Sequence, residues 1–275
     1  MMKQMLEITS LQNPKMKNAA RLFDRKARDE SGLFLIEGYR ELSRAVDGSI
    51  EIVSLFICPP LFLGENEQSL IDKALKGGAD VFSCDPKVFK KLSYRDRPDG
   101  LIAVASQMKL SLDALSRKIQ GKQNPFFLVA ESIEKPGNLG TILRSCDAVG
   151  VDGVIICDRC TDIYNPNVVR ASVGTLFTVP VVEAEGSQVL IWLKSRGVKI
   201  LSSTPNTDVE YTEADLSGPV ALVVGTEQLG LSEAWLSQAD VKVRIPMMGV
   251  ADSLNVATAT TLLLYEVLRQ RSSTR

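Results

Sequence analysis

Short apolar runs alternate with helical segments along the chain from residue 125 onward. The runs lie at Phe126–Val129, Val154–Cys157, Thr178–Val182, Lys199–Ser202, Val220–Val224 and Val241–Ile245. Continuous apolar strands separated by helices are typical of a parallel sheet that is covered by helices on both faces. The pattern therefore predicts an α/β domain with a parallel sheet over residues 124–275.

The first 110 residues carry a smaller α/β pattern. Residues Asn13–Arg28 place apolar side chains at helical spacing with basic residues between them, which predicts one amphipathic helix. Further helices are expected at Gly38–Asp47, 69–76 and Pro86–Leu92, and strands at Phe34–Ile36, Ile52–Cys58, Asp80–Ser83 and Gly100–Ser106. The polar segment 111–123 opens with a possible helix cap at Ser111. We therefore expect one domain at 1–110, a linker or connecting helix at 111–123 and a second domain at 124–275.

Length and composition agree with two soluble domains. A chain of 275 residues with 45% apolar side chains can bury two modest cores. Its five cysteines form no regular framework and its start lacks the apolar core of a secretion signal, so we expect a cytoplasmic protein. No apolar run approaches the roughly 18 residues that a membrane helix needs. Cys157 and Cys160 have the spacing of a zinc or redox pair, but no second pair or histidine accompanies them, so no metal site is expected.

Basic residues gather near the N-terminus, although the formal net charge of the chain is −1. This group consists of Lys15, Lys17, Arg21, Arg25, Lys26 and Arg28, and a second group consists of Lys87, Lys90, Lys91, Arg95 and Arg97. The first four residues, Lys15, Lys17, Arg21 and Arg25, are the candidate RNA contacts, and we call them the basic stretch. Such residues often form only a solvated helix face. They can also bind phosphate, because nucleic-acid affinity depends on local positive charge. The second interpretation holds only if the other half of the chain acts on RNA.

Three segments of the last half carry the candidate chemistry: 135–144 (KPGNLGTILR), 223–231 (VVGTEQLGL) and 244–258 (RIPMMGVADSLNVAT). The first predicts a helix that presents Asn138 and Arg144 away from its apolar face, at the strand end where ligands of open α/β sheets bind. The second lacks the Gly-Lys-Ser/Thr ending of a phosphate-binding loop. The third starts a helix with small and hydroxyl-bearing residues, which permit close approach of another backbone.

The order and residues of these segments resemble the SpoU/TrmH branch of the SPOUT methyltransferases, which transfer a methyl group from S-adenosylmethionine to a ribose 2′-oxygen of structured RNA. A fourth block, residues 165–174 (NPNVVRASVG), matches the same branch. The resemblance implies a SPOUT domain with a deep C-terminal trefoil knot at 124–275, and an N-terminal substrate-binding domain similar to ribosomal protein L30e at 1–110.

The resemblance also implies roles for individual residues. The implied catalytic residues are Arg144, Asn138, Glu227, Ser253 and Asn255. The implied cofactor contacts are Gly225, Ile245 and Leu254 through backbone atoms, with Thr226 and Met247 beside them. Arg170 in the fourth block joins the basic stretch as a candidate RNA contact, and a structural role for this arginine is equally compatible with the sequence.

Proton removal from the ribose needs an explanation, because the chain contains no histidine, the commonest general base. A guanidinium stays charged and accepts protons poorly. We therefore expect Arg144 to stabilise negative charge on the 2′-oxygen, while the identity of the proton acceptor, Arg144 or an RNA phosphate among the candidates, stays open.

These observations together predict an S-adenosylmethionine-dependent RNA 2′-O-ribose methyltransferase, with ribosomal RNA favoured over transfer RNA. The alternative is a non-catalytic RNA-binding or ribosome-assembly protein that keeps the same fold. A homodimer through the knotted half is expected, because Leu262, Leu263, Tyr265 and Val267 make the last helix apolar on more than one side. No membrane or metal partner is expected.

Overall fold

The computed structural model describes residues 6–158, 161–226 and 228–272, which form two compact units. The first unit contains the residues up to Met108 together with Asp162–Thr178. The second contains Lys109–Thr161 and the residues from Val179 onward. A segment from the middle of the sequence thus completes the N-terminal unit.

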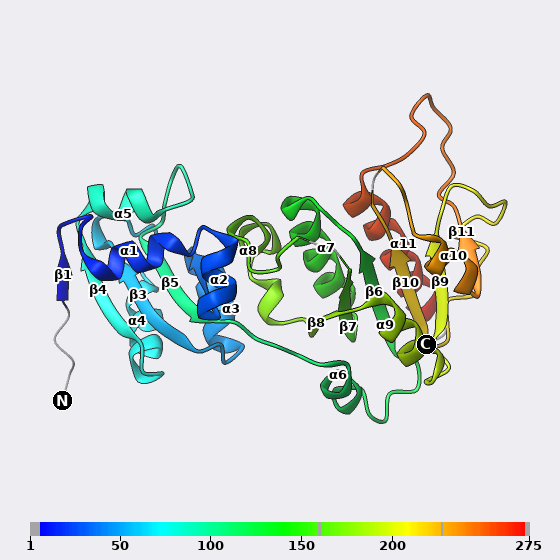
Figure 1. The fold of residues 1–275 in the computed structure, drawn as a ribbon, viewed down its shortest axis with the longest axis horizontal. Helices are drawn as coiled ribbons and strands as arrows, with labels where there is room; N and C mark the ends of the chain where they lie inside the picture. The colour runs from blue at the N-terminus through cyan, green and yellow to red at the C-terminus, as the bar shows by residue number, and fades with distance from the viewer. Residues whose placement is uncertain (1–5, 159–160, 227, 273–275) are drawn as a thin grey trace. The chain divides into compact units, whose positions relative to one another are not determined.

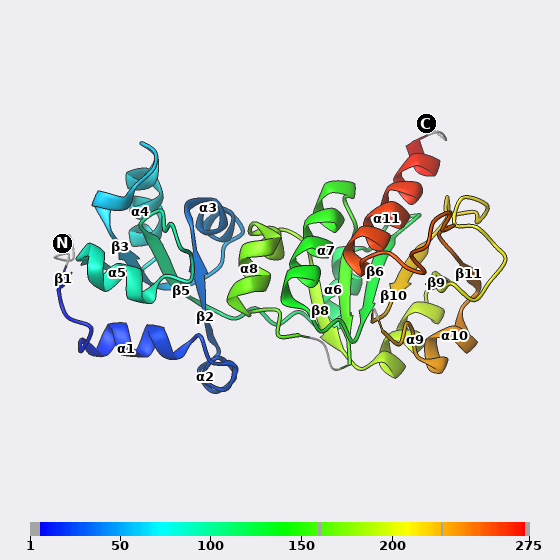
Figure 2. The same cartoon turned by 90° about the horizontal axis from the view of Figure 1, so that it is seen from above.

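The first unit is built on a five-stranded sheet in the order β1-β4-β3-β5-β2. Its strands are β1 (Leu6–Ile8), β2 (Leu33–Glu37), β3 (Ile52–Ile57), β4 (Asp80–Cys84) and β5 (Leu101–Ser106). Its helices are α1 (Pro14–Arg21), α2 (Arg25–Ser31), α3 (Tyr39–Asp47), α4 (Glu67–Lys76), α5 (Pro86–Leu92) and α8 (Pro166–Ser172), with short 3-10 turns at Pro59–Leu61 and Thr175–Phe177. Helices α1 and α5 cover one face of the sheet and α3 and α4 the other (Figure 2).

The predicted single helix over Asn13–Arg28 is wrong, because two helices occupy this region. Helix α1 ends at Arg21, and Asp24 starts α2 by accepting hydrogen bonds from the backbone nitrogens of Lys26 and Ala27. An aspartate in this position satisfies amide groups that a new helix leaves without partners. The apolar spacing continues through the break, which is why periodicity alone missed it. The other helices and strands predicted for residues 33–106 are confirmed within a few residues of their expected ends.

Helix α8 packs against β2 of the first unit. The Arg28 guanidinium, only 2% exposed, donates to the Asp162 carboxylate at 2.7 Å and also to the backbone oxygens of Leu22 and Phe23. The rings of Phe34 and Tyr164 lie 4.6 Å apart between centroids. These contacts make residues 162–178 part of the first unit's core.

The second unit is a six-stranded parallel sheet in the order β11-β9-β10-β6-β7-β8. Its strands are β6 (Phe126–Glu131), β7 (Gly153–Cys157), β8 (Val181–Ala184), β9 (Lys199–Ser203), β10 (Val220–Val224) and β11 (Val241–Val243). Its helices are α6 (Leu112–Lys118), α7 (Pro136–Val149), α9 (Gly186–Lys194), α10 (Glu233–Gln238) and α11 (Val256–Ser272). Helices α7 and α11 pack together on one face, and α9 and α10 lie on the other (Figures 1 and 2).

The predicted α/β class and parallel sheet are confirmed for this unit. All residues of the central strands β6 and β10 are buried, as expected for strands covered on both faces. Two predicted strand boundaries are wrong: β8 begins at Val181 rather than Thr178, because a 3-10 turn occupies Thr175–Phe177, and β11 ends at Val243 rather than Ile245. Across the described residues, no helix is both long and apolar enough to cross a lipid bilayer.

Candidate active site

The carboxyl ends of β6 and β10 meet at one edge of the second unit's sheet. The two strands are parallel neighbours, and Val224 lies opposite Ala130. The chain leaves β6 toward α7 and leaves β10 into the loop that starts with Gly225. Ligands of open α/β sheets bind beyond the carboxyl ends of the strands. The pairing therefore brings the first two candidate segments, 135–144 and 223–231, to the position where a site is expected.

Helix α7 presents its candidate residues on the side away from the core. Its apolar face is fully buried through Leu139, Ile142, Leu143 and Cys146. Asn138 is half-buried and Arg144 is exposed. None of the described residues holds the Arg144 guanidinium by a hydrogen bond or an ion pair, so this charge is available to a ligand.

The loop after β10 is closed tightly on itself. The backbone groups of Thr226 and Gly230 exchange two hydrogen bonds of 3.1 Å, and the Thr226 hydroxyl accepts a third from the Leu229 nitrogen. A Cβ on residue 225 would lie 2.3 Å from the Gly230 carbonyl oxygen, so only glycine fits at this position. The predicted catalytic residue Glu227 lies outside the described residues.

Glu131 supports this loop, although the sequence analysis did not single it out. It ends β6, is 6% exposed, and accepts a hydrogen bond of 2.8 Å from the backbone nitrogen of Ser232, which precedes α10. The carboxylate thus links the end of β6 to the chain that follows the Gly225 loop. A charged residue at the end of an otherwise apolar strand was the signal that could have identified it.

The third candidate segment joins the first through Asn255. Its side-chain nitrogen donates to the Asn138 side-chain oxygen at 3.2 Å, and its side-chain oxygen accepts from the Ala257 nitrogen at the start of α11. Farther along, the hydroxyls of Ser145 and Thr261 are 2.7 Å apart and connect α7 to α11. The Asn138–Asn255 contact joins the first and third segments across 117 positions of the sequence, and the pairing of β10 with β6 brings the second segment to the same edge of the sheet. Ser253, two residues before Asn255, is exposed, and its hydroxyl donates to the Asp252 carboxylate at 3.4 Å.

The segment between β11 and α11 combines irregular backbone with partly exposed apolar side chains. Residues 245–255 lie outside helices and strands, so their backbone amides are not committed to a regular hydrogen-bond pattern. Ile245, Met247 and Leu254 are half-buried, whereas Met248 and Val250 are almost fully exposed. Exposed apolar side chains often mark a binding surface. Apolar side chains beside uncommitted backbone groups suit a flat heterocycle with a polar edge, as adenine is.

The predicted RNA-binding residues all lie in the first unit. Lys15, Lys17 and Arg21 are exposed on α1, and Arg25 is exposed on α2, where it lies 3.6 Å from Asp29. Arg170 is exposed on α8 and donates to the Asn167 side chain at 3.1 Å.

The cysteines have the environment of core residues. Cys146 and Cys157 are buried, and burial raises the pKa of the Cys146 thiol, which therefore stays protonated near neutral pH. Cys160 lies outside the described residues. Within the described ranges, no three histidine, cysteine, aspartate or glutamate side chains are grouped as metal ligands.

Two sequence profiles match the chain. The profile of the SpoU rRNA Methylase family matches residues 125–265, and that of the MRM3-like substrate binding domain matches residues 13–103. The two matches fall on the two halves that the sequence pattern separates.

Full-length relatives carry related names. A 23S rRNA (uridine(2479)-2′-O)-methyltransferase of Streptomyces viridochromogenes is 32% identical over 93% of this chain and 89% of its own length. The 23S rRNA (guanosine(2553)-2′-O)-methyltransferase RlmP of Bacillus subtilis is 29% identical over 96% of this chain and 99% of its own.

Solved structures agree with these matches. The AdoMet-bound rRNA methyltransferase of Sinorhizobium meliloti has a TM-score of 0.88 at 32% identity and covers 97% of this chain and 98% of its own. An RNA 2′-O ribose methyltransferase has a TM-score of 0.84 at 42% identity, with 97% and 100% coverage.

Proposed function

The chain belongs to the SpoU rRNA methylase family, and from this membership we propose that it transfers a methyl group from S-adenosylmethionine to a ribose 2′-hydroxyl of 23S ribosomal RNA. The observation that carries the proposal is the contact between Asn138 at the start of α7 and Asn255 just before α11, with Arg144 exposed on the same helix α7. The names of the relatives favour ribosomal over transfer RNA. A cytoplasmic location follows from a ribosomal substrate.

When bound, S-adenosylmethionine would supply an electrophilic methyl group on its sulfonium. The ribose 2′-oxygen bonds to the methyl carbon as the carbon–sulfur bond breaks, so that S-adenosylhomocysteine leaves and the hydroxyl proton is released. The 2′-hydroxyl is a weak acid near neutral pH, so the protein must stabilise negative charge on its oxygen. We assign this task to Arg144, whose guanidinium is exposed and unengaged among the described residues. The proton leaves for Glu227 or for an RNA phosphate, because a guanidinium accepts protons poorly and the chain has no histidine.

Asn138 and Asn255 act as positioning residues in this proposal. Their side chains contact each other at 3.2 Å, and Asn255 is also held by the Ala257 nitrogen. The pair therefore fixes the start of α7 relative to the start of α11. Ser253 lies in the exposed chain just before this pair, where it can contact the bound substrate.

The cofactor is assigned to the loop after β10 and the segment after β11. Gly225, Ile245 and Leu254 offer backbone groups, and Thr226 and Met247 flank them. The tight closure of the Gly225 loop supports this assignment, because a flat ligand needs a backbone surface without protruding side chains. Orientation of sulfonium, methyl and oxygen in one line is then the main contribution of the protein.

A deep trefoil knot in the second unit is part of the proposal. Its support is that the connection between β9 and β10 contacts both the end of β11 and the last helix. Arg244 exchanges backbone hydrogen bonds with Val209 and Tyr211 of this connection. Near the end of α11, the Gln270 side chain bonds to the backbone of Ala214 and Leu216 in the same connection.

A homodimer through the second unit is also proposed. Helix α11 buries Leu263 and Val267, yet Leu262 remains 39% exposed and Tyr265 49% exposed. An apolar strip on the outer side of a helix that already covers a sheet suits a second copy of the chain. The first unit, which matches a substrate-binding domain, is proposed to resemble ribosomal protein L30e and to bind the RNA.

The proposal is tested by mapping 2′-O-methyl groups in 23S rRNA from cells with and without the gene, together with calorimetry of S-adenosylmethionine binding. We expect one ribose methylation to disappear with the gene and to return when purified protein and S-adenosylmethionine are added. A protein that binds RNA but neither binds S-adenosylmethionine nor changes the methylation map would be the non-catalytic alternative.

A further inference from the structure

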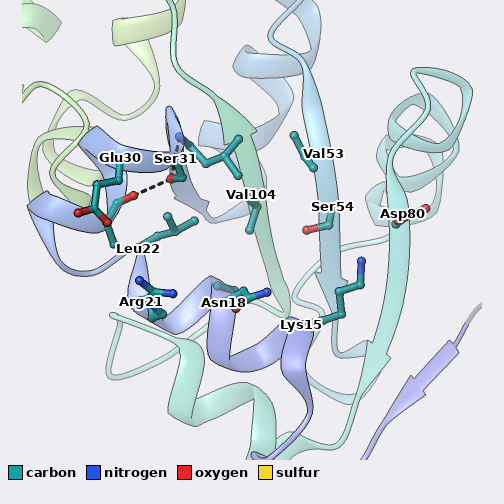
Figure 3. A pocket seen from close by; sticks show the side chains of 13 residues that line it. Lys15, Asn18, Arg21, Leu22, Glu30, Ser31, Val53, Ser54, Asp80 and Val104 are labelled. Atoms are coloured by element: carbon teal, nitrogen blue, oxygen red, sulfur yellow. Dashed lines mark hydrogen bonds between the residues drawn. The ribbon is translucent and has the colours of Figure 1, made fainter.

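An open hollow lies wholly within the first unit, between helices α1 and α2 and one end of the sheet (Figure 3). Its volume is about 420 Å³, within the range of sites that bind small ligands. The side chains around it come from the two helices and from strands β2, β3, β4 and β5. Nothing in the proposed methyl-transfer site accounts for it.

The hollow exists because α1 stops before it covers the sheet completely. Helix α1 ends at Arg21, and the chain turns through residues 22–24 before α2 begins. The uncovered floor contains Leu33, Val53 and Val104. Val53 lies at an irregularity of β3, where the register against β5 shifts between Ile52 and Ser54, and it remains 40% exposed. The floor is therefore apolar and reachable from solvent.

Its walls are fixed before any ligand arrives. The buried Arg28 guanidinium bonds to the Leu22 and Phe23 oxygens and to Asp162, and so holds the turn between α1 and α2. Asp24 caps α2 with two further hydrogen bonds. A preformed site loses little conformational entropy on binding.

The rim has the polar groups that a nucleotide requires. Lys15 and Arg21 bring positive charge from α1, and Asn18 lies between them with an amide that can donate and accept (Figure 3). The Lys15 ammonium lies 5.6 Å from the centre of the Phe82 ring, so this exposed side chain points toward the sheet. On the opposite side, Ser54 offers a hydroxyl for the edge of a base.

From these features we propose that the hollow binds one unpaired nucleotide of the RNA substrate, with its base on the Val53 and Val104 floor and its phosphate near Lys15 and Arg21. Proteins recognise RNA mainly through unpaired bases that can leave the helix and stack on a protein surface. This subsite rests on the proposed function for its biological substrate. In this proposal Lys15 and Arg21 of the basic stretch bind a phosphate and are not merely part of a solvated helix face.

The test uses the full-length protein and unpaired hexanucleotides of adenosine, cytidine or uridine, with blunt duplexes of the same length as comparison. Val53→Trp fills the hollow from its exposed floor, and Asn18→Ala removes a rim amide without touching the core. We expect the first variant to weaken binding of at least one hexanucleotide about tenfold, and the second about three- to fivefold, with duplex binding unchanged. Leu11→Trp is the matched control, because Leu11 is an exposed apolar residue of the same unit that does not line the hollow.

Thermal unfolding of the full-length protein, followed by circular dichroism, checks that each variant is folded. Equal hexanucleotide affinities for the parent, Val53→Trp and Asn18→Ala would overturn the subsite, as would a parent protein that prefers duplexes. If Val53→Trp does not fold, the hexanucleotide affinity of Asn18→Ala alone decides whether the subsite exists. If the affinities overturn the subsite but the parent protein still methylates 23S rRNA, the proposed function is unaffected. Nucleotide binding in the hollow without any methyl transfer by the parent would instead remove the proposed function.

Discussion

Replacing Gly225 by alanine tests most directly the proposal that the loop after β10 binds the cofactor. The added Cβ would lie 2.3 Å from the Gly230 oxygen, 2.5 Å from the Gly230 carbonyl carbon and 2.8 Å from the Leu231 nitrogen. Ordinary contacts of a Cβ begin at 3.4 Å, so the loop must retreat by about 3.4 − 2.3 = 1.1 Å. All three atoms belong to the backbone, and no side-chain rotation can relieve the clash.

Overpacking of this kind costs about 1–3 kcal/mol. For a domain of about 150–250 residues, each kcal/mol lowers the melting temperature by about 2–4 °C, so we expect a fall of about 2–12 °C. The displaced loop should also weaken S-adenosylmethionine binding by about tenfold or more, because orientation of backbone groups is lost.

Calorimetry measures the affinity, and thermal unfolding followed by circular dichroism measures the stability. Gly218→Ala is the matched control, since a Cβ there meets nothing within 4 Å and the backbone angle is ordinary. A Gly225→Ala protein with the parent's melting temperature and the parent's cofactor affinity would refute this placement of the Gly225–Gly230 loop.

Three further outcomes are expected. Arg144→Ala should abolish methyl transfer to 23S rRNA while S-adenosylmethionine affinity changes less than about twofold, and transfer at the parent's rate would show that Arg144 has another role. Glutamine in place of all four residues of the basic stretch should reduce the slope of log affinity against log salt by about three units, and an unchanged slope would leave these residues as a solvated face. Arg28→Met should lower the free energy of unfolding in urea by about 3–5 kcal/mol because it leaves Asp162 buried without its partner, whereas Arg25→Met, which breaks only an exposed pair, should cost less than about 1 kcal/mol.

The proposed dimer has a separate test. Light scattering at concentrations down to low micromolar should give twice the chain mass, and Tyr265→Glu should lower it toward the monomer, because a charge cannot be buried in an apolar interface without a large desolvation cost. A monomer mass for the parent at every concentration would contradict the dimer.

The parts of the fold that local sequence determines were predictable. The strands β6, β7 and β10 are apolar, apart from Glu131 at the end of β6, because both faces are covered, and this pattern needs no knowledge of distant residues. The break between α1 and α2 was missed, although Asp24 is a typical capping residue, because the apolar spacing continued across it. The short edge strand β1 has only three residues and gave no periodic signal.

The candidate site could be assembled from the sequence only through the family resemblance. The Asn138–Asn255 contact joins residues 117 positions apart, and no local pattern specifies such a partner. Glu131 was missed for a similar reason, since its role depends on the Ser232 nitrogen about a hundred residues later in the chain. The role of Glu227 stays a prediction, since that residue lies outside the described ranges.

The assignment of residues 162–178 to the first unit has a consequence for the order in which the chain is built. Translation produces the N-terminal sheet first, and its last strand is finished at Ser106. At that stage Arg28 has no carboxylate partner and Phe34 has no Tyr164 to cover it. The first unit therefore reaches its final packing only after residues 162–178 have left the ribosome, when β6, α7 and β7 of the second unit have already emerged. A gene fragment that ends near residue 110 would therefore lack part of this unit, including the Asp162 partner of Arg28 and the Tyr164 ring beside Phe34.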